Sequence, residues 1–153
     1  MTHTLPQIPP KPPGDSVRGF LPDHEGQQLF EWACQAAPVG PLLEIGSYCG
    51  RSTVWLGQAA GAHDTVVFAL DHHRGSEEHQ PGESHHDEAL MDTTGRFNSF
   101  GEFRRNIEAA GLEDTIIPIV ARSETVGPYW QSGLGMVFID GGHSLDAALT
   151  DYR

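Results

Sequence analysis

Positive charge, cysteine and long apolar runs are all scarce in this sequence. Nine Lys and Arg residues face 21 Asp and Glu residues, so the formal net charge is −12, and Lys11 is the only lysine. This balance argues against nucleic acid and anionic membranes as partners, because a phosphate-rich surface is bound by a basic one. Small anionic or zwitterionic ligands in a local pocket remain compatible with it.

The two cysteines, Cys34 and Cys49, are too few for a disulfide framework, which predicts a reduced, cytoplasmic setting. No stretch approaches the ~20 apolar residues that a membrane-spanning helix needs. The N-terminus lacks a basic start followed by an apolar run, so no secretory signal is expected.

The length of 153 residues favours one domain with a substantial core. Five prolines fall within residues 1–19, which predicts an extended, Pro-rich flexible tail ahead of a domain over 20–153. Such a tail is either a loose terminus or a segment that packs on the body or on a partner.

Apolar periodicity and turn residues predict a helix followed by four strand–helix pairs. Ser99 and Glu102 have the spacing of a capping box, Ser144 can cap the last helix, and Pro118 places its strand near a sheet edge. The alternation predicts an α/β fold with a doubly wound, mainly parallel sheet, whose ligands lie beyond the carboxyl ends of the strands. The expected strands cover 41–46, 65–70, 115–120 and 135–140, and the expected helices 23–37, 51–60, 99–110, 124–131 and 144–153.

The first strand is followed by a loop with two glycines four residues apart, Gly46 and Gly50, which opens a helix. Such a turn lets backbone approach a ligand closely, and the helix N-terminus suits a carboxylate or a phosphate. The loop has neither the G-x-G-x-x-G spacing nor the lysine of a P-loop, which disfavours a dinucleotide or a nucleoside triphosphate. A plain glycine turn is the alternative.

Polar residues also follow the other three strands. Asp71 stands 21 residues after Gly50, near the offset at which an acidic residue binds ribose hydroxyls. Ser123 could read an adenine edge or cap a helix. Asp140 could hold Mg²⁺, and His143 could act as a general base, although both residues could equally be structural.

At this point the sequence resembles the class I S-adenosylmethionine-dependent methyltransferases. The run Leu43-Glu44-Ile45-Gly46-Ser47-Tyr48-Cys49-Gly50-Arg51-Ser52 is similar to the first motif of the catechol and caffeoyl-CoA O-methyltransferase branch. The run Phe138-Ile139-Asp140-Gly141-Gly142-His143-Ser144 is similar to related bacterial sugar and macrolide O-methyltransferases. The resemblance covers about residues 20–153 and implies a Rossmann-like fold with S-adenosylmethionine as cofactor.

The resemblance also implies a role for each matching residue. Asp140 matches the first metal carboxylate of the Mg²⁺-dependent members, whereas His143 matches no established catalytic position; these two are the candidate catalytic residues. The implied cofactor contacts are Glu44, Gly46 and Tyr48 around the methionine end, Gly50 in the same loop, Ser52 at the methionine carboxylate, Asp71 at the ribose, and Arg122 and Ser123 beside the adenine.

Two features depart from the family. The sequence stops after the fourth strand, where family members continue with further strands and the rest of the metal site, so we expect a fragment of a longer protein or a degenerate member. Residues 71–88 hold five histidines and six carboxylates. They form a surface loop, a lid over the acceptor site, or a site for Zn²⁺, Ni²⁺ or Fe²⁺. His72 and Arg74, which closely follow Asp71, are expected to touch the ligand.

The resulting hypothesis is an S-adenosylmethionine-dependent methyltransferase, O-directed on a small-molecule acceptor, with or without Mg²⁺. The alternatives are a non-catalytic or truncated S-adenosylmethionine-binding domain, an NAD-dependent enzyme and a metal-storage or metal-sensing protein. The acceptor itself is open between sugar, phenol and peptide, and a homo-oligomer is compatible with the sequence.

Overall fold

The structure, a computed structural model, describes residues 9–142 and 144–153. Its centre is a sheet of four parallel strands in the order β3-β2-β1-β4. The first three strands lie side by side in chain order, and β4 lies on the other side of β1. This order confirms the predicted doubly wound α/β fold and puts its switch point between β1 and β4. The strands are β1 (Leu42–Ile45), β2 (Val67–Leu70), β3 (Ile116–Ile119) and β4 (Met136–Ile139).

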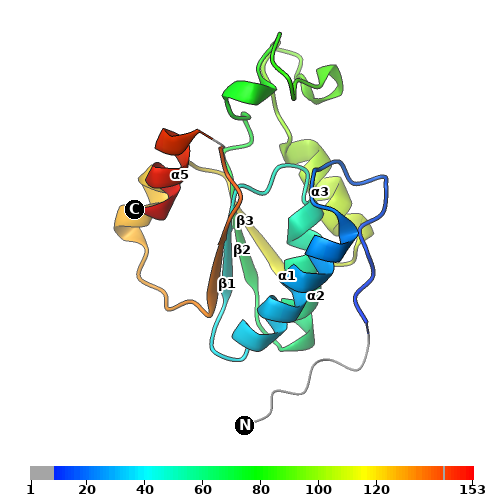
Figure 1. The fold of residues 1–153 in the computed structure, drawn as a ribbon, viewed down its shortest axis with the longest axis vertical. Helices are drawn as coiled ribbons and strands as arrows, with labels where there is room; N and C mark the ends of the chain where they lie inside the picture. Colours follow the sequence, from blue (N-terminus) through cyan, green and yellow to red (C-terminus); the bar gives the residue numbers. More distant parts are fainter. Residues whose placement is uncertain (1–8, 143) are drawn as a thin grey trace.

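Helices lie on both sides of the sheet (Figure 1). On one side are α1 (Asp23–Ala36), α2 (Arg51–Ala62) and α3 (Phe100–Ala109), and on the other are α4 (Ser123–Val126) and α5 (Leu145–Tyr152). The predicted cap of α5 is confirmed, because the Ser144 side chain accepts a hydrogen bond from the Ala147 amide at 3.2 Å. Pro118 lies on β3, which is an edge strand, as predicted from its missing N–H.

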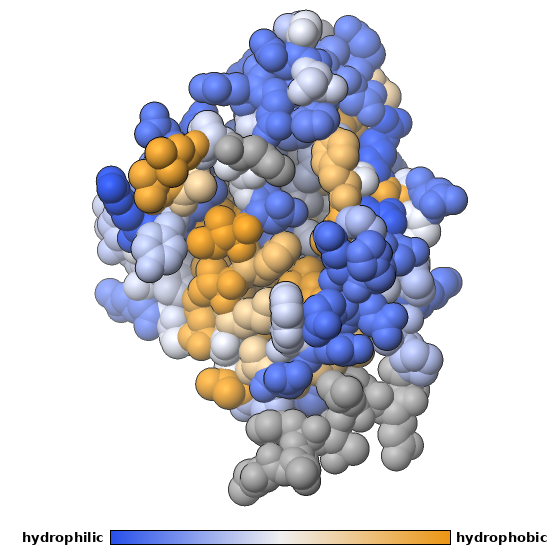
Figure 2. Space-filling model, in the orientation of Figure 1, coloured by the Kyte–Doolittle hydropathy of each residue, from blue (hydrophilic) through white to orange (hydrophobic). Residues whose placement is uncertain are grey.

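The main core lies between the sheet and α1, α2 and α3. Trp55 and Phe103 are its largest fully buried side chains. Gly26 of α1 makes the contact with α2 possible, because a Cβ atom at this position would lie 2.1 Å from Trp55 Nε1. The opposite face is less well covered. Val137 and Ile139 of β4 are exposed, and Figure 2 shows a band of apolar surface on this side of the molecule.

Three local predictions were wrong. α2 continues past Gly61 to Ala62, and the helix expected over 124–131 is the short α4 followed by a 3-10 turn, Gly127–Tyr129. The capping box at the start of α3 does not form. The Ser99 hydroxyl instead lies 2.8 Å from Nδ1 of His73, and Glu102 accepts a hydrogen bond from Arg18 at 2.9 Å. At the start of α3, these tertiary contacts override the local sequence signal.

The N-terminal segment packs on the body over the residues that the structure describes. The Lys11 amide donates to Gln58 Oε1 at 2.7 Å, and the Arg51 guanidinium donates to the carbonyls of Gly14, Val17 and Leu21. Of the two arrangements open for residues 1–19, the described part shows the packed one. The division of the chain into a tail over 1–19 and a domain over 20–153 stays a prediction.

The residues between β2 and α3 form a long excursion above the sheet, here called the lid segment, residues 72–98 (Figure 1). It contains two 3-10 turns, Glu77–His79 and Glu88–Leu90, and a bridge between Met91 and Phe97. Residues 9–142 and 144–153 hold no group of three or more His, Cys, Asp or Glu side chains placed to bind a metal, so a metal site in this segment gains no support. Over the same residues, no helix is long and apolar enough to cross a membrane.

Candidate functional site

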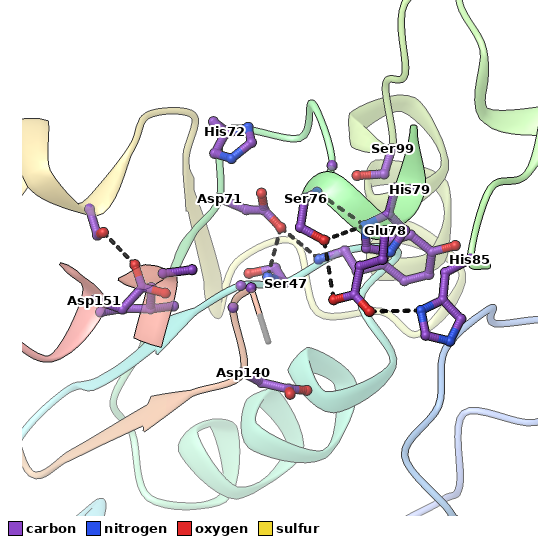
Figure 3. A pocket seen from close by; sticks show the side chains of 18 of the residues that line it. Ser47, Asp71, His72, Ser76, Glu78, His79, His85, Ser99, Asp140 and Asp151 are labelled. Carbon is purple, nitrogen blue, oxygen red and sulfur yellow. Dashed lines mark hydrogen bonds and ion pairs between the residues drawn. The ribbon is translucent and has the colours of Figure 1, made fainter. Parts of the chain in front are cut away.

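A cavity of about 1100 Å³ opens over the carboxyl ends of the four strands (Figure 3). It is lined by residues that follow each strand in turn: 45–48 after β1, 70–72 after β2, 121–124 after β3 and 140–142 after β4. The lid segment and the stretch ahead of α1 complete the wall. The sequence-predicted residues after all four strands are therefore brought to one pocket, apart from those named below.

The loop after β1 is shaped by its first glycine. Gly46 has φ +90°, and a Cβ atom there would lie 2.3 Å from the carbonyl oxygen of Asp140. The loops after β1 and β4 therefore touch at the switch point, and only glycine fits between them. Gly50 also has a left-handed backbone, φ +93°, where it precedes α2. A Cβ atom on Gly50 would lie 3.2 Å from the Phe103 ring, and Gly50 does not line the pocket, so its contact with a ligand stays a prediction.

Asp71 ties the β1 loop to the end of β2. One oxygen of its carboxylate accepts hydrogen bonds from the amides of Ser47 and Tyr48, at 2.9 and 2.8 Å, and the other accepts from the His73 amide at 2.8 Å. Because a carboxylate has about four acceptor positions, Asp71 still has one to offer to a ligand hydroxyl in the pocket. Figure 3 shows Asp71 between Ser47 and His72.

The two neighbours of Asp71 that were expected to touch a ligand differ from each other. His72 lines the pocket, and its Nδ1 atom accepts from the Arg74 amide. Arg74 points away and binds the Asp92 carboxylate at 2.8 Å, so the structure does not support its contact with a ligand. His73, one of the five histidines considered as metal ligands, is buried between α3 and the loop, where burial lowers its pKa.

Glu44 lies beneath the pocket and does not line it, and its contact with the methionine end stays a prediction. Its side chain is fully buried, and its carboxylate accepts hydrogen bonds from the hydroxyls of Ser52 and Thr53 on α2. Burial raises its pKa to about 7, because these hydroxyl bonds offset only part of the cost of desolvation. Ser52 itself lines the pocket, at the first turn of α2.

The end of the pocket near β3 is formed by α4 and α5. Arg122 and Ser123 line it, and the Ser123 hydroxyl donates to the carboxylate of Asp151 on α5. A Cβ atom on Gly141 would lie 2.2 Å from the other Asp151 oxygen, so the loop after β4 also lies against this carboxylate. Sequence reasoning missed Asp151, since its contact with Ser123 spans 28 residues and leaves no local signal.

Asp140 and His143 were the predicted catalytic residues. Asp140 lines the pocket at the end of β4, where its amide donates to the Ile45 carbonyl at 2.8 Å. His143 lies outside the described residues, so its role as a base stays a prediction. Asp140 is not part of any group of three or more potential metal ligands among the described residues, so this part of the chain does not by itself fit a Mg²⁺ site.

Aromatic rings form the wall opposite Asp151. The Tyr48 ring stacks on His79 at 5.2 Å between ring centres and on Phe97 at 6.3 Å, and Phe20 lies 4.7 Å from the His85 ring. His85 is held by Glu78, whose carboxylate lies 2.9 Å from Nδ1. The lid segment therefore forms part of the pocket wall, whereas its role as a lid over an acceptor site stays a prediction.

Comparison with known proteins decides the family. A family model described as a methyltransferase domain matches residues 43–153. The chain belongs to this methyltransferase family. The match begins in β1 and includes every strand and both glycine-containing loops, after β1 and after β4.

Solved structures with the same fold include several methyltransferases. The cofactor-bound protein Rv0187 from MTB is 25% identical, with a TM-score of 0.50 over 75% of this chain and 43% of that one. The O-methyltransferase from Bacillus cereus in complex with SAH is 20% identical, with a TM-score of 0.54 over 82% and 48%. The SAH-bound Podospora anserina methyltransferase PaMTH1 is 15% identical, with a TM-score of 0.52 over 90% and 55%. The chain thus spans about half the length of these proteins.

Proposed function

We propose that this chain binds S-adenosylmethionine in the pocket over the strand ends, as the methyl donor of a methyltransferase. The observation that carries the proposal is the position of Asp71, which lies between the glycine loop after β1 and the α4–α5 end of a single cavity. The family match and the cofactor-bound or SAH-bound state of the similar structures support the same ligand.

Three regions of the pocket match the three parts of this cofactor. Asp71 accepts hydrogen bonds from the ribose hydroxyls, and the methionine part lies over Gly46 and Tyr48. The first turn of α2, at Ser52, presents the positive end of a 12-residue helix to the methionine carboxylate. The adenine lies between His72 and Ser123.

Methyl transfer from this cofactor requires little covalent participation by the protein. Methyl transfer from a sulfonium to an oxygen needs the acceptor in line with the methyl group and stripped of its proton. We propose a small-molecule hydroxyl as acceptor, with the lid segment as one wall of its site and His143 as the base. The described residues do not fit a complete Mg²⁺ site, so no step of this mechanism runs through a metal.

The alternative is a domain that binds the cofactor without catalysing transfer. Cofactor binding without methyl transfer to any acceptor would favour this candidate, whereas transfer from labelled S-adenosylmethionine to a sugar, phenol or peptide would exclude it.

Calorimetric titration with S-adenosylhomocysteine tests the cofactor assignment. The proposal predicts binding by the chain and its loss in Asp71→Ala. Asp114→Ala is the matched control, because Asp114 is exposed and does not line the pocket. Circular dichroism on each sample confirms that it is folded. A folded chain that does not bind S-adenosylhomocysteine, or an Asp71→Ala variant that binds like the control, would contradict the proposal.

A further inference from the structure

We propose that Asp151 accepts a hydrogen bond from the exocyclic amino group of the cofactor's adenine and makes the pocket select adenosyl over inosyl compounds. The inference rests on the proposed cofactor, and it assigns a base-reading role to a residue of α5. Its carrying observation is the contact between Asp151 and Ser123 at one end of the cavity (Figure 3).

Asp151 is held in place from two sides. Its Oδ1 atom accepts the hydrogen bond from the Ser123 hydroxyl, and its Oδ2 atom lies against the backbone at Gly141. The absence of a side chain at Gly141 is required for this, since a Cβ atom there would lie 2.2 Å from Oδ2. Residues on three elements thus fix one carboxylate at the rim of the cavity: Ser123 on α4, Gly141 after β4 and Asp151 on α5.

This contact changes what Ser123 can offer to a ligand. The hydroxyl has one proton, and that proton is directed to Asp151, so Ser123 presents lone pairs to the cavity. An ionised carboxylate has no donor at all. Thr150, which also lines this end, donates its hydroxyl to the Asp146 carbonyl on its own helix. The side chains of Asp151, Ser123 and Thr150 therefore present acceptors to a base, and Arg122 lines the same end of the pocket with donors.

An acceptor-rich end matches the amino group of adenine. The exocyclic amine carries two N–H donors, whereas hypoxanthine has a carbonyl oxygen at the same position. That oxygen would face the lone pairs of Asp151 and Ser123, with no proton between them. A site that bonds a donor disfavours an analogue that lacks it, because the acceptor is left unpaired.

The test compares S-adenosylhomocysteine with S-inosylhomocysteine, by calorimetric titration of the whole chain. Hydrogen bonds to charged groups predict that the wild type binds the adenosyl compound about 10- to 100-fold more tightly. Asp151→Asn presents both a donor and an acceptor, and so should reduce this preference to within about 3-fold. Asp146→Asn is the matched control, because Asp146 is on the same helix but does not line the cavity.

The ratio of the affinities for the adenosyl and inosyl compounds distinguishes recognition of the base by Asp151 from a purely structural role of this residue. If Asp151 only braces Ser123, Asp151→Asn will weaken both compounds equally and leave the ratio unchanged, which would overturn the inference. Asp151→Ser is a second variant in case the asparagine variant does not fold, and it should also lose the preference. A wild type that binds both compounds equally well would overturn the inference while leaving the cofactor assignment intact, whereas a wild type that binds neither would overturn both.

Discussion

Replacing Glu44 by glutamine should change how the stability of this protein depends on pH. Glu44 is fully buried, and burial raises its pKa from 4.5 to about 7. A carboxyl group with a raised pKa in the folded state favours folding while it is protonated, below pH 4.5, and that contribution is lost as the pH rises through 7. The difference between the two values corresponds to about 3 kcal/mol.

Glutamine is a close match in shape and does not titrate. Its amide oxygen can still accept a hydrogen bond from the Ser52 hydroxyl, and its amide NH2 group can donate one to the Thr53 hydroxyl. The packing beneath the pocket is therefore kept. Between pH 5 and pH 8 the wild type should therefore lose about 2–3 kcal/mol more free energy of unfolding than Glu44→Gln. All other titrating groups are common to both proteins, so their effects cancel in this comparison.

Urea unfolding at the two pH values, followed by tryptophan fluorescence, measures this difference. Trp55 is a suitable reporter because it is fully buried against α1. Equal pH dependence in the two proteins would refute the reasoning, since it would mean that Glu44 ionises in the folded state as easily as in the unfolded chain.

Three further substitutions test other parts of the structure. Gly46→Ala puts a methyl group against the Asp140 carbonyl and a side chain on a left-handed backbone. It should therefore lower the melting temperature by several degrees and abolish S-adenosylhomocysteine binding in calorimetry, whereas unchanged binding would contradict the close contact. Arg51→Ala removes the donor that holds the N-terminal segment, so limited proteolysis should cut within residues 11–21 faster than in the wild type, and equal rates would count against this packing. Ser99→Ala leaves Nδ1 of buried His73 without its partner, which should cost about 1–3 kcal/mol in urea unfolding; a cost near zero would show that the contact is not needed.

The order of the elements and the positions of the strand ends could be predicted from the sequence, because both depend on local patterns. Short apolar runs such as Val67–Leu70 mark strands buried on both faces, and glycines and polar residues mark where they end. Once the fold is a parallel sheet, its strand ends must meet at one edge. Asp71, Ser123 and Asp140 follow different strands, and this is why they share one pocket in the structure.

Side-chain partners could not be predicted in the same way, because they depend on contacts between distant segments. Glu44 follows the pattern of a ligand-facing residue, but strand alternation turns it towards α2, where Ser52 and Thr53 satisfy its carboxylate. Ser99 has the spacing of a helix cap, but His73 takes its hydroxyl. Asp151 lies in the last turn of the final helix, and nothing in the local sequence indicates its contact with Ser123.

A crystal structure of the chain with S-adenosylhomocysteine would test the central claim most directly. The account predicts the ligand in the cavity over the strand ends, with its ribose hydroxyls on Asp71, its methionine part over Gly46 and Tyr48, and its adenine beside Ser123. A ligand bound elsewhere, or bound in this cavity with the adenine over the glycine loop and the methionine part at α4, would contradict it.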